Sequence, residues 1–100
     1  MRRYLVIDLE ATCDDQGAVP REEMEIIEIG AALLDPSTWV VREEFDSFVR
    51  PVRNPRLTPF CTRLTTITQA DVDAAPDFVE AGVKMQDWLR PFRLTAWGSG

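Results

Sequence analysis

Residues 6–13 read VIDLEATC and place two acids at the end of an apolar run that begins near the N-terminus. The wider segment 3–9, RYLVIDL, predicts a short and largely buried β-strand. Side chains alternate between the two faces of a strand, so Asp8 and Glu10 should project from one face, at most about 7 Å apart along the strand. Two carboxylates this close repel each other unless a positive group compensates them.

The compensating group for this acid pair is not evident among the neighbouring residues, because no lysine lies nearby and the chain contains no histidine. One interpretation is a divalent cation, since hard oxygen ligands suit Mg²⁺ or Mn²⁺. The other interpretation is a pair of solvated acids at the end of an exposed strand. The residues alone leave both interpretations open.

The composition, with 45% hydrophobic and 28% charged residues in a chain of 100, is that of one soluble globular domain. No apolar stretch approaches the roughly 20 residues that a membrane helix needs, and no secretory signal is visible. Cys13 and Cys61 form neither a disulfide framework nor a CxxC pair, which indicates free thiols in a reducing compartment. We therefore expect a cytoplasmic protein without membrane association.

The charge is acidic overall but unevenly distributed. Seventeen acids against 11 bases give a net charge of −6, which argues against nonspecific coating of duplex nucleic acid. Between Ser47 and Ala70, however, there is no acid, and four arginines lie there: Arg50, Arg53, Arg56 and Arg63. This basic stretch is either a solvated face or a strip that guides phosphates.

The expected order of elements is strand, strand, strand, helix, strand. After the first strand, residues 24–35 and 39–49 predict two strands joined by a turn at 36–38, hence an antiparallel hairpin with a bulge. A proline-rich crossing leads to two helical turns, at 60–64 and 69–73. A helix is then expected from Pro76 to about Arg90, with its apolar stripe at Phe78, Val79, Val83, Met85 and Leu89, followed by a strand at 94–97.

Four segments, VIDLEATC, EIIEIGAALLD, FVRP and FCTRLTTITQADVDAAPDF, occur in an order and spacing that resemble the DEDD family of 3′→5′ exonucleases. The nearest branch holds histone-mRNA and small-RNA 3′ exonucleases and sporulation-inhibitor-like bacterial proteins, and the likeness covers essentially the whole chain. It implies an α/β ribonuclease-H-like exonuclease fold, of which these elements are the N-terminal portion of a mixed sheet. It also implies hydrolysis of single-stranded RNA or DNA from the 3′ end, with RNA slightly favoured.

The same resemblance implies roles for the residues around the first strand. Asp8 and Glu10 would be catalytic metal ligands, the first two of four carboxylates that share two Mg²⁺ or Mn²⁺ ions. Ala11 and Thr12 would lie near the terminal ribose of the substrate.

A second implied contact lies in the helical turns. Leu64, Thr65 and Ile67 would pack beside the terminal base, although core packing is an alternative for Leu64 and Ile67, and Thr65 could instead cap a helical turn. Relatives commonly carry glycine where Thr66 stands.

Several other residues have structural interpretations. Glu25 and Glu28 should point to opposite faces of the second strand, and a structural hydrogen bond is the favoured role for Glu28. The two cysteines should be small buried residues. The three tryptophans should pack in the core or hairpin rather than stack on bases: Trp39, Trp88 and Trp97.

The resemblance also implies groups that residues 1–100 do not contain. The third acid is expected just beyond Gly100, and the fourth acid and a histidine base further downstream. A tyrosine base is no replacement, because Tyr4 is the only tyrosine and begins the first strand. Residues 1–100 are therefore expected to be the N-terminal portion of a single exonuclease domain, inactive when isolated. Self-association through an uncovered sheet edge is a further expectation. The alternative is a noncatalytic module that binds nucleic acid or a protein on the same scaffold.

Overall fold

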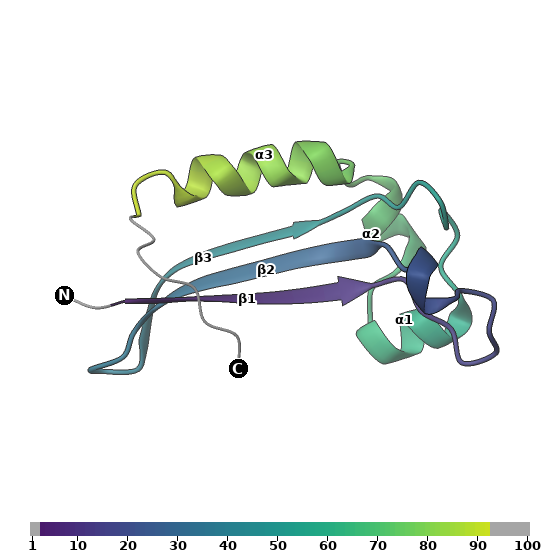
Figure 1. The fold of residues 1–100 in the computed structure, drawn as a ribbon, viewed down its shortest axis with the longest axis horizontal. Coiled ribbons are helices and arrows are strands. Elements are labelled where there is room, and N and C mark those ends of the chain that lie inside the picture. The colour runs from purple at the N-terminus through teal and green to yellow at the C-terminus, as the bar shows by residue number, and fades with distance from the viewer. Residues whose placement is uncertain (1–2, 93–100) are drawn as a thin grey trace.

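The structure, a computed structural model, describes residues 3–92. Three antiparallel strands form one sheet in the order β1 (Tyr4–Ala11), β2 (Ile26–Asp35), β3 (Val40–Phe48) (Figure 1). The three predicted strands and the hairpin between the second and third are confirmed. The strand expected at 94–97 lies outside the described residues.

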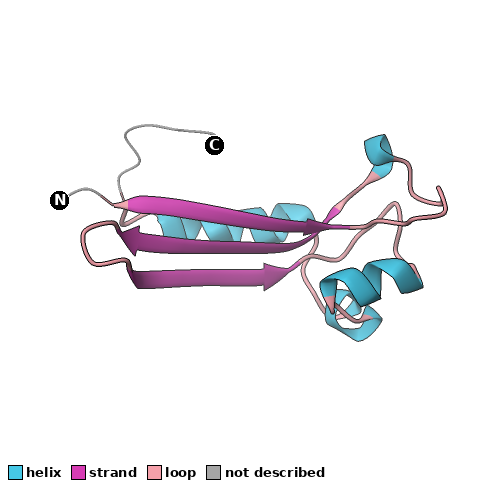
Figure 2. Ribbon diagram, turned by 90° about the horizontal axis from the view of Figure 1, so that it is seen from below, coloured by secondary structure: helices cyan, strands magenta, loops and turns pink. Residues whose placement is uncertain are grey.

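One face of the sheet is covered by the helix α3 (Phe78–Leu89), which runs along it (Figure 1). Ile29 of β2, Val49 and Ala81 of α3 are buried together, and Phe45 and Met85 pack against them. Seen from below, no helix lies over the opposite face of the three strands within residues 3–92 (Figure 2). The two faces therefore differ, one buried under α3 and the other open.

β1 is not the buried strand that its sequence predicts. Four of its large apolar side chains are exposed, namely Tyr4, Val6, Ile7 and Leu9. The reason is its place at the edge of the described sheet, where β2 is its only strand neighbour and its apolar residues face both ways.

Two irregularities in strand pairing correct the simple alternation. The register of β1 against β2 shifts after Glu10, which leaves Ile27 as an extra residue. A second shift opposite Leu33 leaves Arg42 as the extra residue, so the bulge predicted for the third strand lies near its start. Ile27 consequently joins a second core cluster rather than the one beneath α3.

That second cluster lies beyond the end of β1, where α1 (Pro59–Thr65) and α2 (Gln69–Asp73) fold (Figure 1). Both short helices confirm the predicted turns. The backbone N–H of Cys61 donates to the Thr58 hydroxyl at the start of α1, and Thr68 forms a reciprocal capping box at the start of α2. The buried members are Ile27, Leu57, Cys61, Ile67 and Val72.

α3 begins later than the sequence predicts and turns a different face inward. Asp77 caps the helix by accepting a hydrogen bond from the N–H of Glu80, 2.9 Å away, so Pro76 precedes the cap. The predicted apolar stripe is only partly correct, because Ala81 is buried whereas three of its members are exposed: Phe78, Val79 and Val83.

The tryptophans divide between packing and exposure. The Trp88 ring lies 5.7 Å from that of Phe45 and 5.2 Å from that of Phe92, as expected for a packing residue. Trp39 instead stands 72% exposed in the β2–β3 turn with a φ of 58°, and Trp97 lies outside the described residues. Among the helices of residues 3–92, none combines the length and apolarity needed to cross a bilayer.

The left-handed end of α1 generates a stability prediction. Thr66 has φ 64° and ψ 5°, a conformation that costs a non-glycine residue about 1–2 kcal/mol. We expect Thr66→Gly to raise the free energy of unfolding by about 0.5–1 kcal/mol after the greater chain entropy of glycine is included. Urea denaturation measures the change. Thr62→Gly, inside α1, is the matched control and should lower stability by about 1 kcal/mol; a loss at both positions would contradict the account.

Candidate functional site

The pairing register collects four acids on the open face of the sheet. Asp8 of β1 lies opposite Gly30 of β2, which in turn lies opposite Asp46 of β3. One row along, Glu10 lies opposite Glu28. Directly opposed residues share a face. Because Leu9 pairs with Ile29, which is buried beneath α3, the acids project on the side away from that helix.

Gly30 leaves the space between the outer acids free of side chain. A Cβ at this position would lie 3.7 Å from the carbonyl oxygen of Asp8 and 4.0 Å from Oδ1 of Asp46. The Asp46 carboxylate therefore lies close to Gly30, which separates it from Asp8 in the same row of the sheet. The acids on β1 and β3 belong to one surface rather than to two separate edges.

Glu28 is the acid whose chemistry this crowding changes most. Burial raises the pKa of Glu28 to about 7, helped by the neighbouring Asp46 side chain and by the charges of Glu10 and Asp8. Asp46 is the acid beside Glu28, and the structural hydrogen bond predicted for Glu28 stays a prediction. The sequence reasoning missed Asp46, because a count from the Asp35–Val40 pair places Phe45 opposite Gly30, and only the bulge at Arg42 moves Asp46 into that position.

The acid pair fits a divalent cation by its donor type, but it supplies only part of a ligand set. Neither Asp8 nor Glu10 has an ion-pair partner within residues 3–92. In this same part of the chain, no three Asp, Glu, Cys or His side chains are placed to hold a metal ion together. Two carboxylates are nevertheless enough for Mg²⁺ when water and substrate oxygens complete its octahedron.

The segment after the acid pair is held by the start of β2. The Thr12 N–H donates to the Glu25 carbonyl over 2.8 Å, and the Glu25 N–H donates to the Thr12 hydroxyl over 2.9 Å. Thr12 is only 2% exposed, and Ala11 is half-buried. The structure thus fixes both residues beside the acid pair, with the Thr12 hydroxyl already accepting a hydrogen bond; their contact with a ribose stays a prediction.

The three residues expected beside a terminal base differ in their access to solvent. Leu64 is 65% exposed on α1, whereas Ile67 is 3% exposed in the second core cluster. The Thr65 hydroxyl donates to the Cys61 carbonyl at 2.8 Å and accepts from the Ile67 N–H at 3.2 Å. Of the three, Leu64 is the most exposed, Thr65 is half-buried and Ile67 is buried, and contact with a base stays a prediction for all of them.

The cysteines lie next to each other and next to this segment. Both are free thiols, Cys61 fully buried and Cys13 half-buried. Burial raises the pKa of Cys13 to about 11, with further contributions from a hydrogen bond to Cys61 and from its charge. The Cys61 thiol also donates to the Ala11 carbonyl over 3.7 Å. Their role as small packing residues is confirmed for Cys61.

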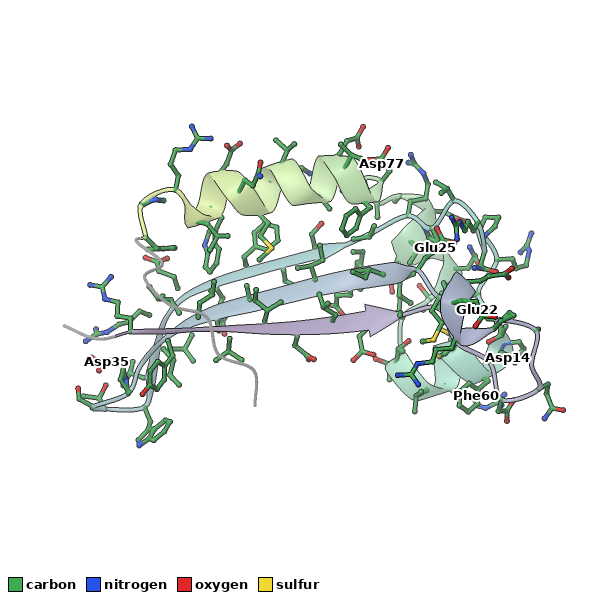
Figure 3. All side chains as sticks on the ribbon, in the orientation of Figure 1. Asp14, Glu22, Glu25, Asp35, Phe60 and Asp77 are labelled. Atoms are coloured by element: carbon green, nitrogen blue, oxygen red, sulfur yellow. The ribbon has the colours of Figure 1, made fainter. Side chains whose placement is uncertain are left out.

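The arginine loop, residues 50–56, is anchored by Glu25 rather than by its own secondary structure. The Glu25 carboxylate accepts hydrogen bonds from the backbone N–H groups of Val52, Arg53 and Asn54 at 2.6–2.8 Å. Glu25 lies just before β2, at the end of the sheet opposite Asp35 (Figure 3). The sequence reasoning did not foresee this role, because the loop is distant in the chain.

The fold and the acids on its open face define a class of protein, the nucleases with a ribonuclease-H-like sheet. Comparison with known proteins gives the family: the Exonuclease family model, RNase T, matches residues 5–96, and the chain belongs to this family. Human ERI1 exoribonuclease 3 is 41% identical over 86 residues, which are 86% of this chain and 25% of that protein. The 3'-5' exonuclease Snipper of Drosophila melanogaster is 39% identical over 87 residues, 86% of this chain and 31% of that protein.

Solved structures agree in fold. The nuclease domain of 3'hExo, a DEDDh family member bound to rAMP, superposes with a TM-score of 0.83 at 38% identity, over 94% of this chain and 46% of that one. A 3'-exonuclease solved for its 3'-end specific recognition of histone mRNA stem-loop gives a TM-score of 0.82 at 38% identity, over 92% and 40%. The predicted DEDD relationship and ribonuclease-H-like fold are confirmed. The chain spans about a quarter to a half of these relatives.

The raised pKa of Glu28 generates a pH prediction. A folded pKa of about 7 against an ordinary 4.5 means that the folded state holds a proton that the unfolded state has lost, so stability falls as pH rises between these values. We expect Glu28→Gln to remove this loss. The variant should exceed the wild type by about 1–2 kcal/mol at pH 8 and match it at pH 4.

Denaturation at several pH values measures this difference. Glu44→Gln is the matched control, because Glu44 is exposed on the same open face, opposite Ala32. A Glu28→Gln advantage that is equal at pH 4 and pH 8 would contradict the assignment.

Proposed function

We propose that this chain carries the acid-pair half of a 3′→5′ exonuclease active site that acts on single-stranded RNA ends, or on DNA ends as the lesser substrate. The observation that carries the proposal is the position of Asp8 and Glu10. They lie together on the open face, without a cationic partner in residues 3–92, in a chain of the Exonuclease family. The histone mRNA and rAMP bound by the two structural relatives support RNA as the substrate class.

The family to which this chain belongs generally uses divalent metal ions, and we propose Mg²⁺ or Mn²⁺ on Asp8 and Glu10. When bound, the ions would activate water and stabilise the leaving 3′ oxygen. The protein's own contribution is placement. The β1–β2 ladder fixes the two carboxylates, and the hydrogen bonds between Thr12 and Glu25 fix the segment beside them. Leu64 offers an exposed apolar surface to a terminal base.

The groups that complete the reaction belong to residues outside 1–100 in this proposal. Hydrolysis requires two further carboxylates and a general base, and the chain has no histidine. The isolated chain is therefore inactive. The alternative function is a noncatalytic module that binds nucleic acid or protein on an exonuclease scaffold.

Two further properties follow from the proposal and the exposed sheet edge. The edge of β1 that no strand of residues 3–92 pairs with, where Val6, Ile7 and Leu9 are exposed, favours self-association of the isolated chain at high concentration. The free thiols of Cys13 and Cys61 support a reducing, cytoplasmic location.

A nuclease assay tests the function directly. The protein to assay is a longer polypeptide that contains residues 1–100 together with the two further carboxylates and the general base. We expect it to shorten 5′-labelled single-stranded RNA stepwise from its 3′ end in Mg²⁺. Asp8→Asn should slow this by at least about 10²-fold, because it removes a charge from the reacting centre. Glu44→Gln, on the same face, should leave the rate unchanged.

The same assay separates the alternatives. The isolated chain should leave the RNA intact, and turnover by it alone would contradict the proposed division of the site. Cleavage inside the strand would contradict an exonuclease. A longer polypeptide that binds RNA without shortening it would establish the noncatalytic module instead.

A further inference from the structure

Glu25 connects two segments that are distant in the chain. Its backbone N–H and carbonyl both form hydrogen bonds with Thr12, which lies two positions after Glu10 of the acid pair. Its carboxylate accepts three consecutive backbone N–H groups, those of Val52, Arg53 and Asn54, together with the Asn54 side-chain amide at 3.2 Å. One residue thus ties the arginine loop to the edge of the candidate active site.

The interaction is of the kind that fixes geometry. Successive N–H groups that converge on one point form an anion-binding concavity, and a carboxylate that fills it makes charge-assisted bonds about twice as strong as neutral ones. Burial raises the pKa of Glu25, but the hydrogen bonds from Arg53, Val52 and Asn54 outweigh it and lower the pKa below its usual range. The anchor therefore remains ionised near neutral pH.

Apart from Glu25 and the Asn54 side-chain bond to the Glu23 carbonyl, the hydrogen bonds that hold the loop lie at its two ends, at Arg50 and Pro55. The loop contains no helix or strand, and Pro51 and Pro55 cannot donate backbone hydrogen bonds. Its N-terminal end is tied by Arg50, whose guanidinium donates to the Ala75 carbonyl at 3.0 Å. Arg53 and Arg56 are both exposed. The Arg53 N–H donates directly to the Glu25 carboxylate. Arg56 instead lies between two residues bonded to Gln69, whose Nε2 donates to the Pro55 carbonyl at 2.7 Å and whose Oε1 accepts from the Leu57 N–H at 2.8 Å.

We propose that Glu25 is a positioning residue for nucleic acid, which holds the arginine loop against the Thr12 segment so that Arg53 meets the phosphates of a strand leading to Asp8 and Glu10. This inference rests on the proposed function, which supplies the nucleic acid. The inference predicts that loss of the Glu25 carboxylate weakens the binding of RNA. Charge attraction alone predicts the opposite effect, because deletion of a negative charge beside arginines should strengthen the binding of a polyanion.

The test measures the affinity of the 100-residue chain for a 5′-labelled single-stranded RNA by fluorescence anisotropy, in Mg²⁺ and over a range of salt concentrations. Glu25→Gln should weaken binding about fivefold or more. It should also reduce the salt dependence by about 0.7 in the logarithmic slope, the value for one phosphate contact on a single strand. Glu22→Gln is the matched control, since Glu22 is an exposed acid in the same segment. It should leave binding unchanged or slightly tighter.

A double-mutant cycle distinguishes positioning from a general loss of structure. Arg53→Gln should weaken binding in the wild-type background but add little in the Glu25→Gln background, because the arginine is then already misplaced. If Glu25→Gln proves unfolded by circular dichroism, Asn54→Ala takes its place. It removes only the side-chain bonds to Glu25 and to the Glu23 carbonyl, and should weaken binding about twofold.

Each outcome has a defined consequence. Glu25→Gln that folds and binds RNA as well as or better than the wild type overturns the inference and leaves the proposed function standing. So do additive effects of Arg53→Gln and Glu25→Gln. A folded wild-type chain that binds no single-stranded RNA overturns the proposed function and the inference with it.

Discussion

The antiparallel register of β1 against β2 is the constraint on which the rest of this structure depends. Because side chains alternate along a strand, a slip by one residue would exchange the two faces. Asp8 and Glu10 would then leave the face that carries Glu28 and Asp46, and the four acids would no longer share one surface.

The register also concentrates negative charge where the sheet is uncovered. Asp8, Glu10, Glu28 and Asp46 share the open face, where burial and the three neighbouring acids raise the pKa of Glu28. Repulsion of this kind lowers the stability of the folded chain by itself. A bound divalent cation would offset this repulsion, and the family to which the chain belongs generally uses such ions.

Local features of the sequence were sufficient to predict the shared face of the acid pair and the hairpin. Alternation around Asp8 and Glu10 placed both on one face, and the turn after Asp35 predicted the hairpin. Nonlocal contacts were not accessible in the same way. The bonds of Glu25 reach 27 to 29 positions along the chain, and β1 reads as a buried strand although it lies at an edge of the described sheet. The start of α3 was missed because Pro76 suits a first helical turn, yet Asp77 caps the helix.

The central claim is that the acid pair is half of a metal site, and calorimetric titration of the chain with Mn²⁺ tests it most directly. The account predicts that the wild type binds Mn²⁺ and that the double variant Asp8→Ala, Glu10→Ala does not, while Glu44→Gln behaves as the wild type. All three proteins should remain folded by circular dichroism. Equal heats for the wild type and the double variant would show that these carboxylates do not hold the metal, and would contradict the account.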